Sequence, residues 1–268
     1  MTQREPYKTD LTDEEWRVLG PIVPDPPEWG RPLEYEMREI INTILYVLRT
    51  GCQWEMTPHD LVPGKSAYYH FSKWRDDGTW ERISVKLHEM EREHIGRDPK
   101  PTAAIADSQS VPTATSGPQR GYDGGKKVKG RKRHLLVDTE GLVIALLVSG
   151  ADIHDADAAK TLMESHPDEL SDIEVIWADS KYSQKGLPEW VSDNLDARIE
   201  VKMRPTDAEG FAVIKRRWVV ERTNAWQMNN RRLQRDVEVL PSSSEAMMHV
   251  AQIDILLRRL VERPSRLT

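Results

Sequence analysis

The feature of this sequence that most restricts its fold is a change in the spacing of apolar residues near residues 96–101. Before this point, for example across residues 34–50, apolar residues recur at positions that share one face of a helix. After it, short runs of Val, Ile and Leu separated by turn residues are typical of strands. The segment between them, GRDPKP, contains two prolines and ends the helical part. We therefore expect a helical region over residues 1–98 and a mixed region over residues 99–268.

The helical region is expected to contain four helices. The segment LTDEEW predicts the first, with Thr12 as its cap, Glu15 in the capping box and an end near Pro21. The others are expected over residues 34–50, with Gly51 as terminator, over residues 66–75, and from Thr79 through Met90. Four short helices suit a DNA-binding unit of the helix-turn-helix type, although many small helical domains share this pattern.

The second region alternates strands and helices. Strands are expected over residues 102–111, 173–182 and 197–203, and a hairpin over residues 132–152 that turns at 139–141. Helices are expected over residues 155–165, 187–195 and 210–235. This order predicts an α+β fold in which a ribonuclease H-like mixed sheet carries helices on its faces.

The charge of the chain is unevenly distributed. The formal net charge is −6, yet two stretches, residues 115–134 and 201–235, each carry a local net charge of +6. Basic stretches in an acidic background can bind a polyanion such as DNA. They can also be solvated loops, and charge alone does not separate the two interpretations.

Composition excludes several classes of protein. The single cysteine excludes an internal disulfide framework and a cysteine-built zinc site. The eight histidines form no metal-like pair on a helix face, and His154, near Asp152 and Asp155, is interpreted as a turn. Neither a bilayer-length apolar segment nor a signal peptide is apparent, so a cytoplasmic location is expected.

Three acidic residues could carry metal-dependent chemistry. Asp107 is expected to end the strand AIAD and Asp179 to end the strand IWAD, so both would project from the carboxyl edge of the sheet. Glu221, in RRWVVERTNAW, lies on a helix that could return over that edge. Carboxylate oxygens are ligands for hard divalent cations, which support phosphodiester chemistry. Aspartate is common where strands stop, so the pair is more informative than either residue alone.

At this point the sequence resembles the transposases of insertion-sequence family five, within the larger group that uses an Asp, Asp, Glu triad. The resemblance covers nearly the whole chain. It rests on these pieces, in the family's order: LTDEEWRVLGPIVP, ILYVLRTGCQWEMTPHDL, WRDDGTWERI, DSQSV, GYDGGKKVKGRKRHLLVDTEG, WADSKY and RRWVVERTNAW.

The resemblance implies that Asp107, Asp179 and Glu221 are the catalytic acids and that they bind Mg²⁺ or Mn²⁺, with two ions expected. It implies a transposase that binds terminal inverted repeats, cleaves the element ends by hydrolysis and joins the 3′-hydroxyl to target DNA. A homodimer on paired ends is expected. Two alternatives stay open: a DNA-binding protein that does not cut, and a nuclease without strand transfer.

Related transposases carry a tyrosine, an arginine and a lysine around the glutamate, where this chain has Ile214, Arg217 and Met228. Only the arginine matches, as a candidate phosphate clamp, although a plain ion pair with Glu221 is an equal alternative. The chain also departs from the family at Asn224 and in LVPGKSAYYH.

The flexible, basic segment GYDGGKKVKGRKRH is expected to follow a phosphate backbone without reading bases. The three tryptophans near the acids, Trp177, Trp218 and Trp226, are expected to pack in the core rather than to stack on bases. The expected DNA-binding residues are Lys126, Lys127, Lys129, Arg131, Lys132, Arg133, Arg217, Arg222, Arg231 and Arg232.

Overall fold

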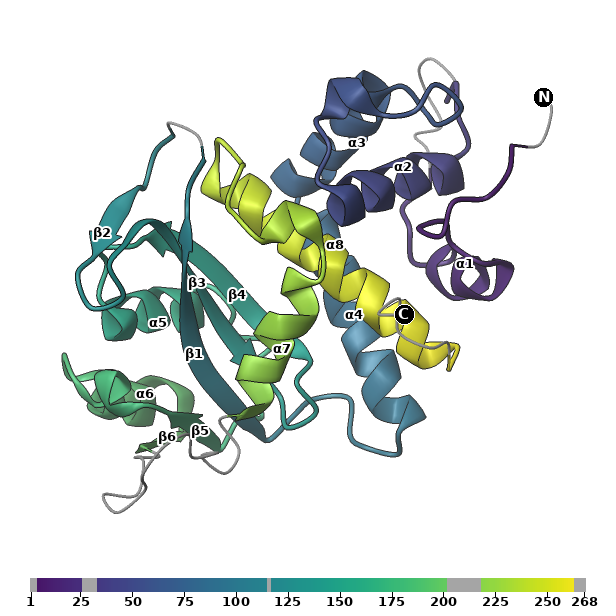
Figure 1. Ribbon diagram of the computed structural model, residues 1–268. Coiled ribbons are helices and arrows are strands. Elements are labelled where there is room, and N and C mark those ends of the chain that lie inside the picture. The colour runs from purple at the N-terminus through teal and green to yellow at the C-terminus, as the bar shows by residue number, and fades with distance from the viewer. Residues whose placement is uncertain (1–3, 26–32, 115–116, 202–217, 263–268) are drawn as a thin grey trace. The chain divides into compact units, whose positions relative to one another are not determined.

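The computed structural model describes residues 4–25, 33–114, 117–201 and 218–262 (Figure 1). Within these ranges the chain forms two compact units. The first comprises residues up to Ile95, Met228–Gln234 and the residues from Ala246 onward. The second comprises Gly96–Gln227 and Arg235–Glu245. The chain therefore passes between the units several times, whereas the sequence suggested a single boundary near residue 98.

The first unit is helical. Its elements are α1 (Asp13–Leu19), α2 (Met37–Thr50), η1 (Trp54–Met56), α3 (Gly64–Asp76), α4 (Thr79–His94), η3 (Arg231–Leu233) and most of α8 (Pro241–Leu260). The predicted start of α1 is confirmed, because Thr12 and Glu15 form a capping box. The predicted end of α2 is also confirmed, since Gly51 adopts a left-handed conformation with φ 71°. None of the helices that the structure describes is long and apolar enough to cross a bilayer.

The helix expected over residues 210–235 is only partly confirmed. Residues 210–217 lie outside the described part of the chain. The described helix, α7 (Trp218–Met228), stops seven residues earlier than expected, and η3 follows it. The helix α8 was not predicted, although its apolar residues Met247, Val250, Ile253 and Leu257 have helical spacing and are buried.

The second unit contains one mixed sheet. Its strands are β1 (Ala103–Pro112), β2 (Gly121–Asp123), β3 (Val128–Val137), β4 (Val143–Gly150), β5 (Val175–Ala178) and β6 (Arg198–Val201). The order is β2-β3-β1-β5-β6, and β4 also pairs with β3. β1 runs parallel to β5 and antiparallel to β3, while β5 runs parallel to β6. The predicted hairpin is confirmed as β3 and β4.

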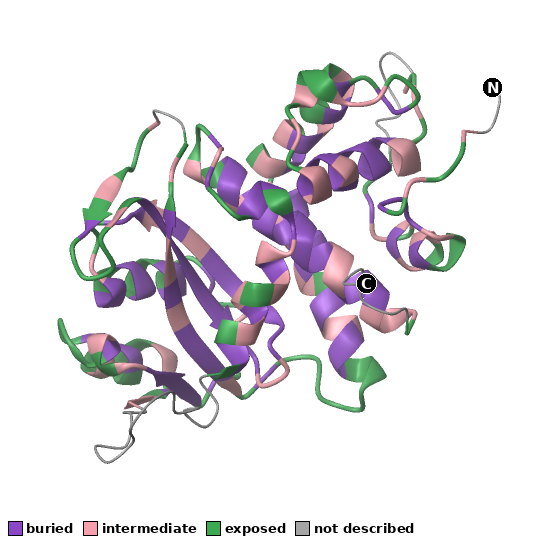
Figure 2. Ribbon diagram, in the orientation of Figure 1, coloured by how far each residue is buried: buried purple, intermediate pink, exposed green. Residues whose placement is uncertain are grey.

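Two helices cover one face of this sheet. Ala159 of α5 (Asp155–Glu164) and Val191 of α6 (Leu187–Leu195) belong to the same buried core as Ala104 and Leu136 of the strands. Burial along most of β3 and β4 is visible in Figure 2. The predicted α+β class and ribonuclease H-like sheet are therefore confirmed, and the sheet order determines which strand ends lie side by side.

Candidate active site

Asp107, in β1, and Asp179, which directly follows β5, occupy equivalent positions in the pairing of these two strands. β1 and β5 are parallel, and their register pairs Ile105 with Trp177. When this register is continued by two residues, past the end of β5, Asp107 lies opposite Asp179. The sheet thus brings together two carboxylate-bearing residues that are 72 positions apart in the chain.

The expectation that Asp107 ends its strand is wrong. β1 continues to Pro112 because its residues Ile105–Pro112 pair with β3. β5, in contrast, ends at Ala178, directly before Asp179. Asp107 therefore lies just beyond the part of β1 that pairs with β5. Asp179 caps the following 3-10 helix, and its Oδ1 accepts a hydrogen bond from the Lys181 backbone N–H at 2.9 Å.

Glu221 lies exposed on α7. The two residues that follow it, Arg222 and Thr223, anchor the helix to the turn between β3 and β4. Thr223 donates its hydroxyl to the carbonyl oxygen of Gly141 at 2.6 Å, and Arg222 donates to that of Glu140 at 2.8 Å. Because β3 is antiparallel to β1, this turn lies at the amino end of β1. The sequence suggested instead that the helix with Glu221 returns over the carboxyl edge of the sheet.

Register therefore supports two of the three predicted acids as neighbours. Among the residues that the structure describes, no group of three or more His, Cys, Asp or Glu side chains is close enough to hold a metal ion. The convergence of Glu221 on the aspartate pair stays a prediction. Carboxylate oxygens are nevertheless the donors that a hard divalent cation requires, so the chemistry of the pair fits such an ion.

The basic segment forms a hairpin instead of an adaptable loop. β2 pairs with the start of β3, and residues 124–127 form the turn between them. Asp123 organises this turn, because its Oδ1 accepts from the backbone N–H groups of Gly125 and Lys126. The Lys126 side chain donates to the carbonyl oxygen of Ser108 at 2.8 Å. This places an ammonium group beside the residue that follows Asp107.

The second half of the same segment is buried within β3. Arg131 and its partner Asp236 are both fully buried, with 3.0 Å between the guanidinium and the carboxylate. Burial lowers the pKa of Arg133 to about 10, although the negative charges of Asp236 and Glu238 act to raise it. The expected track of basic side chains on the surface is therefore reduced to its exposed members, Lys126, Lys127 and Lys129.

A buried carboxylate links two lysines beside the aspartate pair. Asp155, the first residue of α5, is 2% exposed and forms ion pairs with Lys132 of β3 at 2.9 Å and with Lys181 at 3.0 Å. Although burial opposes ionisation, the hydrogen bonds and charges of the two lysines lower the pKa of Asp155 to about 2. The pKa of Lys181 is raised: burial opposes this, but Asp155, Asp179 and Asp123 outweigh it. We define these three residues, Lys132, Asp155 and Lys181, as the lysine clamp.

The lysine clamp was missed from the sequence. His154 is the N-cap residue of α5, where its ring accepts a hydrogen bond from Ala156, so the interpretation of this segment as a simple turn was incomplete. The available signal was Lys181, a cation two residues after Asp179. It gave no indication of Asp155, which lies 26 residues earlier.

Of the remaining predicted DNA-binding arginines, Arg222 and Arg232 have structural partners, Arg231 is exposed, and Arg217 lies outside the described residues. Arg222 lies between the rings of Trp218 and Trp226, 4.5 and 4.6 Å from their centroids. Trp218 is 42% exposed, so the expectation that it packs in the core is wrong for this residue, while Trp177 is buried as expected.

Arg232 is buried in the first unit, where it donates to the carbonyl oxygen of Cys52 at 2.9 Å. Arg231 begins η3 and is exposed, so neither arginine continues α7 as the sequence suggested. Ile214 and Arg217 lie outside the described residues. The DNA-binding roles of these arginines therefore stay predictions.

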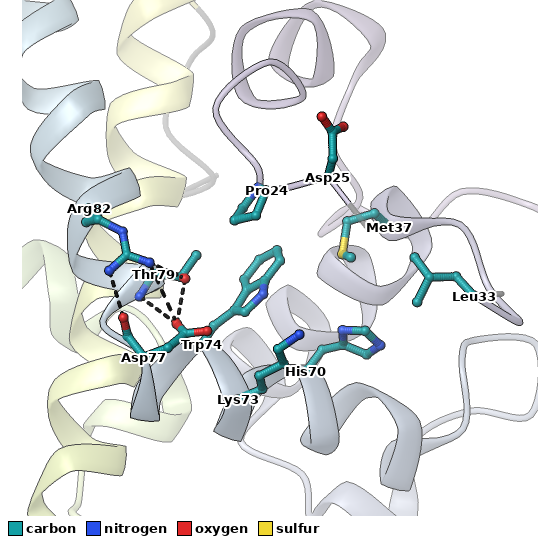
Figure 3. A pocket seen from close by; sticks show the side chains of 10 residues that line it. All are labelled: Pro24, Asp25, Leu33, Met37, His70, Lys73, Trp74, Asp77, Thr79 and Arg82. Atoms are coloured by element: carbon teal, nitrogen blue, oxygen red, sulfur yellow. Dashed lines mark hydrogen bonds and ion pairs between the residues drawn. The ribbon is translucent and has the colours of Figure 1, made fainter. Parts of the chain in front are cut away.

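The helical unit contains a hollow of about 170 Å³ (Figure 3). Trp74 of α3 lies near its centre in the close-up, and Arg82 of α4 closes one side by donating to the carbonyl oxygen of Asp77 and to Thr79 Oγ1. The lining mixes apolar residues with both charges. This arrangement contains no pair of carboxylates comparable to Asp107 and Asp179, so the candidate active site is assigned to the second unit.

Two family models match the chain. Residues 98–251, more than half of the chain, match the model described as "Transposase DDE domain". Residues 11–84 match the model described as "Putative transposase of IS4/5 family". The two matches fall on either side of the change in periodicity near residues 96–101.

Two proteins of Burkholderia cepacia are similar to parts of the chain. The "Putative transposase for insertion sequence element IS402" is 30% identical over 113 residues, which are 39% of this chain and 52% of that protein. The "Insertion element IS402 uncharacterized 16.2 kDa protein" is 26% identical over 125 residues, 42% of this chain and 80% of that protein. The matched part thus spans about half the length of the first relative. No solved structure matches the chain.

Proposed function

The chain belongs to the family defined by the transposase DDE domain, and we propose that it cuts the ends of an insertion sequence and joins them to target DNA. From this membership we infer that the chain is a nucleic-acid-processing enzyme and that DNA is its partner. The resemblance drawn from the sequence is thereby confirmed at the level of the family. The steps, the residues that perform them and the assembly on DNA are proposals.

The observation that carries the proposal is the β1–β5 register, which, continued by two residues, sets Asp107 of β1 opposite Asp179, directly after β5. Their carboxylates, with Glu221 from α7, would hold Mg²⁺ or Mn²⁺. When bound, two such ions activate a water and stabilise the leaving oxygen of a phosphodiester. We propose that the acids serve first in strand cleavage and then in attack by the freed 3′-hydroxyl on target DNA.

The exposed lysines of the β2–β3 hairpin would hold the DNA backbone at this site. Lys126 lies beside Asp107 through its hydrogen bond to Ser108, and Lys127 and Lys129 are exposed nearby in the sequence. Ammonium groups that contact phosphates supply affinity that does not depend on base sequence. Recognition of the terminal repeats is assigned to the helical unit, as a helix-turn-helix type of contact, and the active form is proposed to be a homodimer on paired ends.

The test is strand cleavage by the Asp107→Asn variant. The substrate is a labelled duplex taken from the DNA that flanks the coding sequence, incubated with Mg²⁺. We expect the wild-type chain to nick it at the element end and the variant to lose cleavage by at least about a hundredfold, while binding the duplex. Asp193→Asn, an exposed change on α6, is the matched control and should cleave normally.

The alternatives give different results in the same assay. Binding without any cleavage by the wild-type chain would favour a DNA-binding protein that does not cut. Cleavage without joined products when target DNA is added would favour a nuclease. Full cleavage by Asp107→Asn would overturn the proposed site.

A further inference from the structure

The geometry points to Lys181 as a further phosphate-contacting residue, which the buried carboxylate of Asp155 holds beside Asp179. This inference rests on the proposed function and adds a residue outside the three acids and the basic hairpin. Three features carry it: the exposure of the three members of the lysine clamp, the surplus of charge within it, and its attachment to Asp179.

Exposure separates the two lysines that contact Asp155. The Lys132 side chain is 7% exposed, and its ammonium also donates to the carbonyl oxygen of Ile153 at 2.7 Å. The Lys181 side chain is 43% exposed. Lys132 is therefore an internal counter-charge, whereas the Lys181 side chain is partly exposed, so a ligand can reach it.

The charges within the clamp do not cancel. A buried carboxylate needs one neutralising cation, and Lys132 already supplies it from within the fold. Lys181 makes the net charge of the clamp +1. An ammonium has three N–H donors and the ion pair with Asp155 uses one of them, so Lys181 can still donate to an anion, although Asp179 and Asp123 also attract its charge.

The backbone fixes the position of this surplus charge. The Lys181 N–H donates to Asp179 Oδ1, and the side chain is fastened to Asp155 of α5 on the other side. Together with Lys126, which is fastened beside Asp107, Lys181 gives each aspartate of the pair a lysine neighbour. A phosphodiester brought to the two carboxylates would meet an ammonium next to each of them. Asp155 is then a positioning residue, since it acts through Lys181.

Lys185 provides a matched control four residues further along. It pairs with Asp157, also on α5, at 3.7 Å, but there both side chains are more than half exposed. The two lysines thus lie in the same segment, carry the same charge and pair with residues of the same helix, α5. They differ in the burial of their partner and in their distance along the chain from Asp179.

The experiment compares Lys181→Ala, Lys181→Arg and Lys185→Ala on the labelled flanking duplex. For Lys181→Ala we expect cleavage to fall by about a hundredfold to a thousandfold, in line with the loss of one charge-stabilising group. The slope of log affinity against log salt, measured with the duplex and without metal, should become shallower by about 0.9. Lys181→Arg should keep that slope, and Lys185→Ala should change neither quantity.

Asp155→Asn tests the positioning role. We expect it to lower cleavage, and the double variant with Lys181→Ala to be no slower than Lys181→Ala alone, because both changes remove the contact between Asp155 and Lys181. Circular dichroism identifies a variant that fails to fold, and the Lys181 comparison then stands without it.

Equal cleavage and equal salt slopes for Lys181→Ala and Lys185→Ala would overturn the inference. Failure of the wild-type chain to cut would instead overturn the proposed function. In that event the salt slope still decides whether Lys181 contacts phosphate.

Discussion

The two halves of the basic segment in residues 126–133 have opposite fates. Lys126, Lys127 and Lys129 lie exposed in the turn and at the start of β3. Arg131, only two residues after Lys129, is fully buried against Asp236. A run of positive charge in a sequence can thus combine a candidate DNA contact with internal ion pairs. Substitutions in the buried half should lower the free energy of unfolding far more than substitutions in the exposed half.

The largest effect is expected for Arg131→Met. Its guanidinium donates hydrogen bonds to the Asp236 carboxylate and to the carbonyl oxygens of Pro118, Glu238 and Val239. Removal leaves a buried carboxylate without its cation, which costs about 3–5 kcal/mol of unfolding free energy. Urea unfolding followed by fluorescence measures this. Lys129→Met, on the exposed half, should change the same quantity by less than about 0.5 kcal/mol, and equal losses would abolish the distinction between the halves.

An intermediate effect is expected at Asp155, and it should depend on pH. The pKa of this carboxyl is about 2 in the folded chain and about 3.9 when unfolded. A lowered pKa stabilises the fold above the unfolded value, so the contribution of roughly 2–3 kcal/mol is present at neutral pH and is lost as pH falls from about 4 towards 2. The difference in urea midpoint between wild type and Asp155→Asn should therefore shrink over that window. A constant difference would contradict it.

The smallest effect on stability is expected for the triple change of Lys126, Lys127 and Lys129 to Ala. These exposed side chains contribute little to the fold, so unfolding should change by less than about 1 kcal/mol. Affinity for the flanking duplex should fall, and its salt slope should become shallower by up to about 2.7. Lys160→Ala, an exposed change on α5, should leave the slope unaltered. A triple variant with the wild-type slope would show that the hairpin does not contact phosphates.

The sequence alone determined most of the elements, α8 excepted, and the candidate acids. The capping box at Thr12, the left-handed Gly51 and the strands before Asp107 and Asp179 were predicted because their signals lie within a few neighbouring residues. The resemblance to the transposase family was predicted for the same reason, since its motifs are short and contiguous.

Only the tertiary structure decided which charges face water and which are buried. Arg131 finds Asp236 across 105 positions, and Lys181 finds Asp155 across 26. Neither pairing has a local signal in the sequence. The partner of each cation is set by the sheet register and by the position of α5, which the neighbouring residues do not reveal. Burial then determines the role of each cation: the buried Arg131 contributes to stability, and Lys181, whose partner is buried while its own side chain is partly exposed, can contact a ligand.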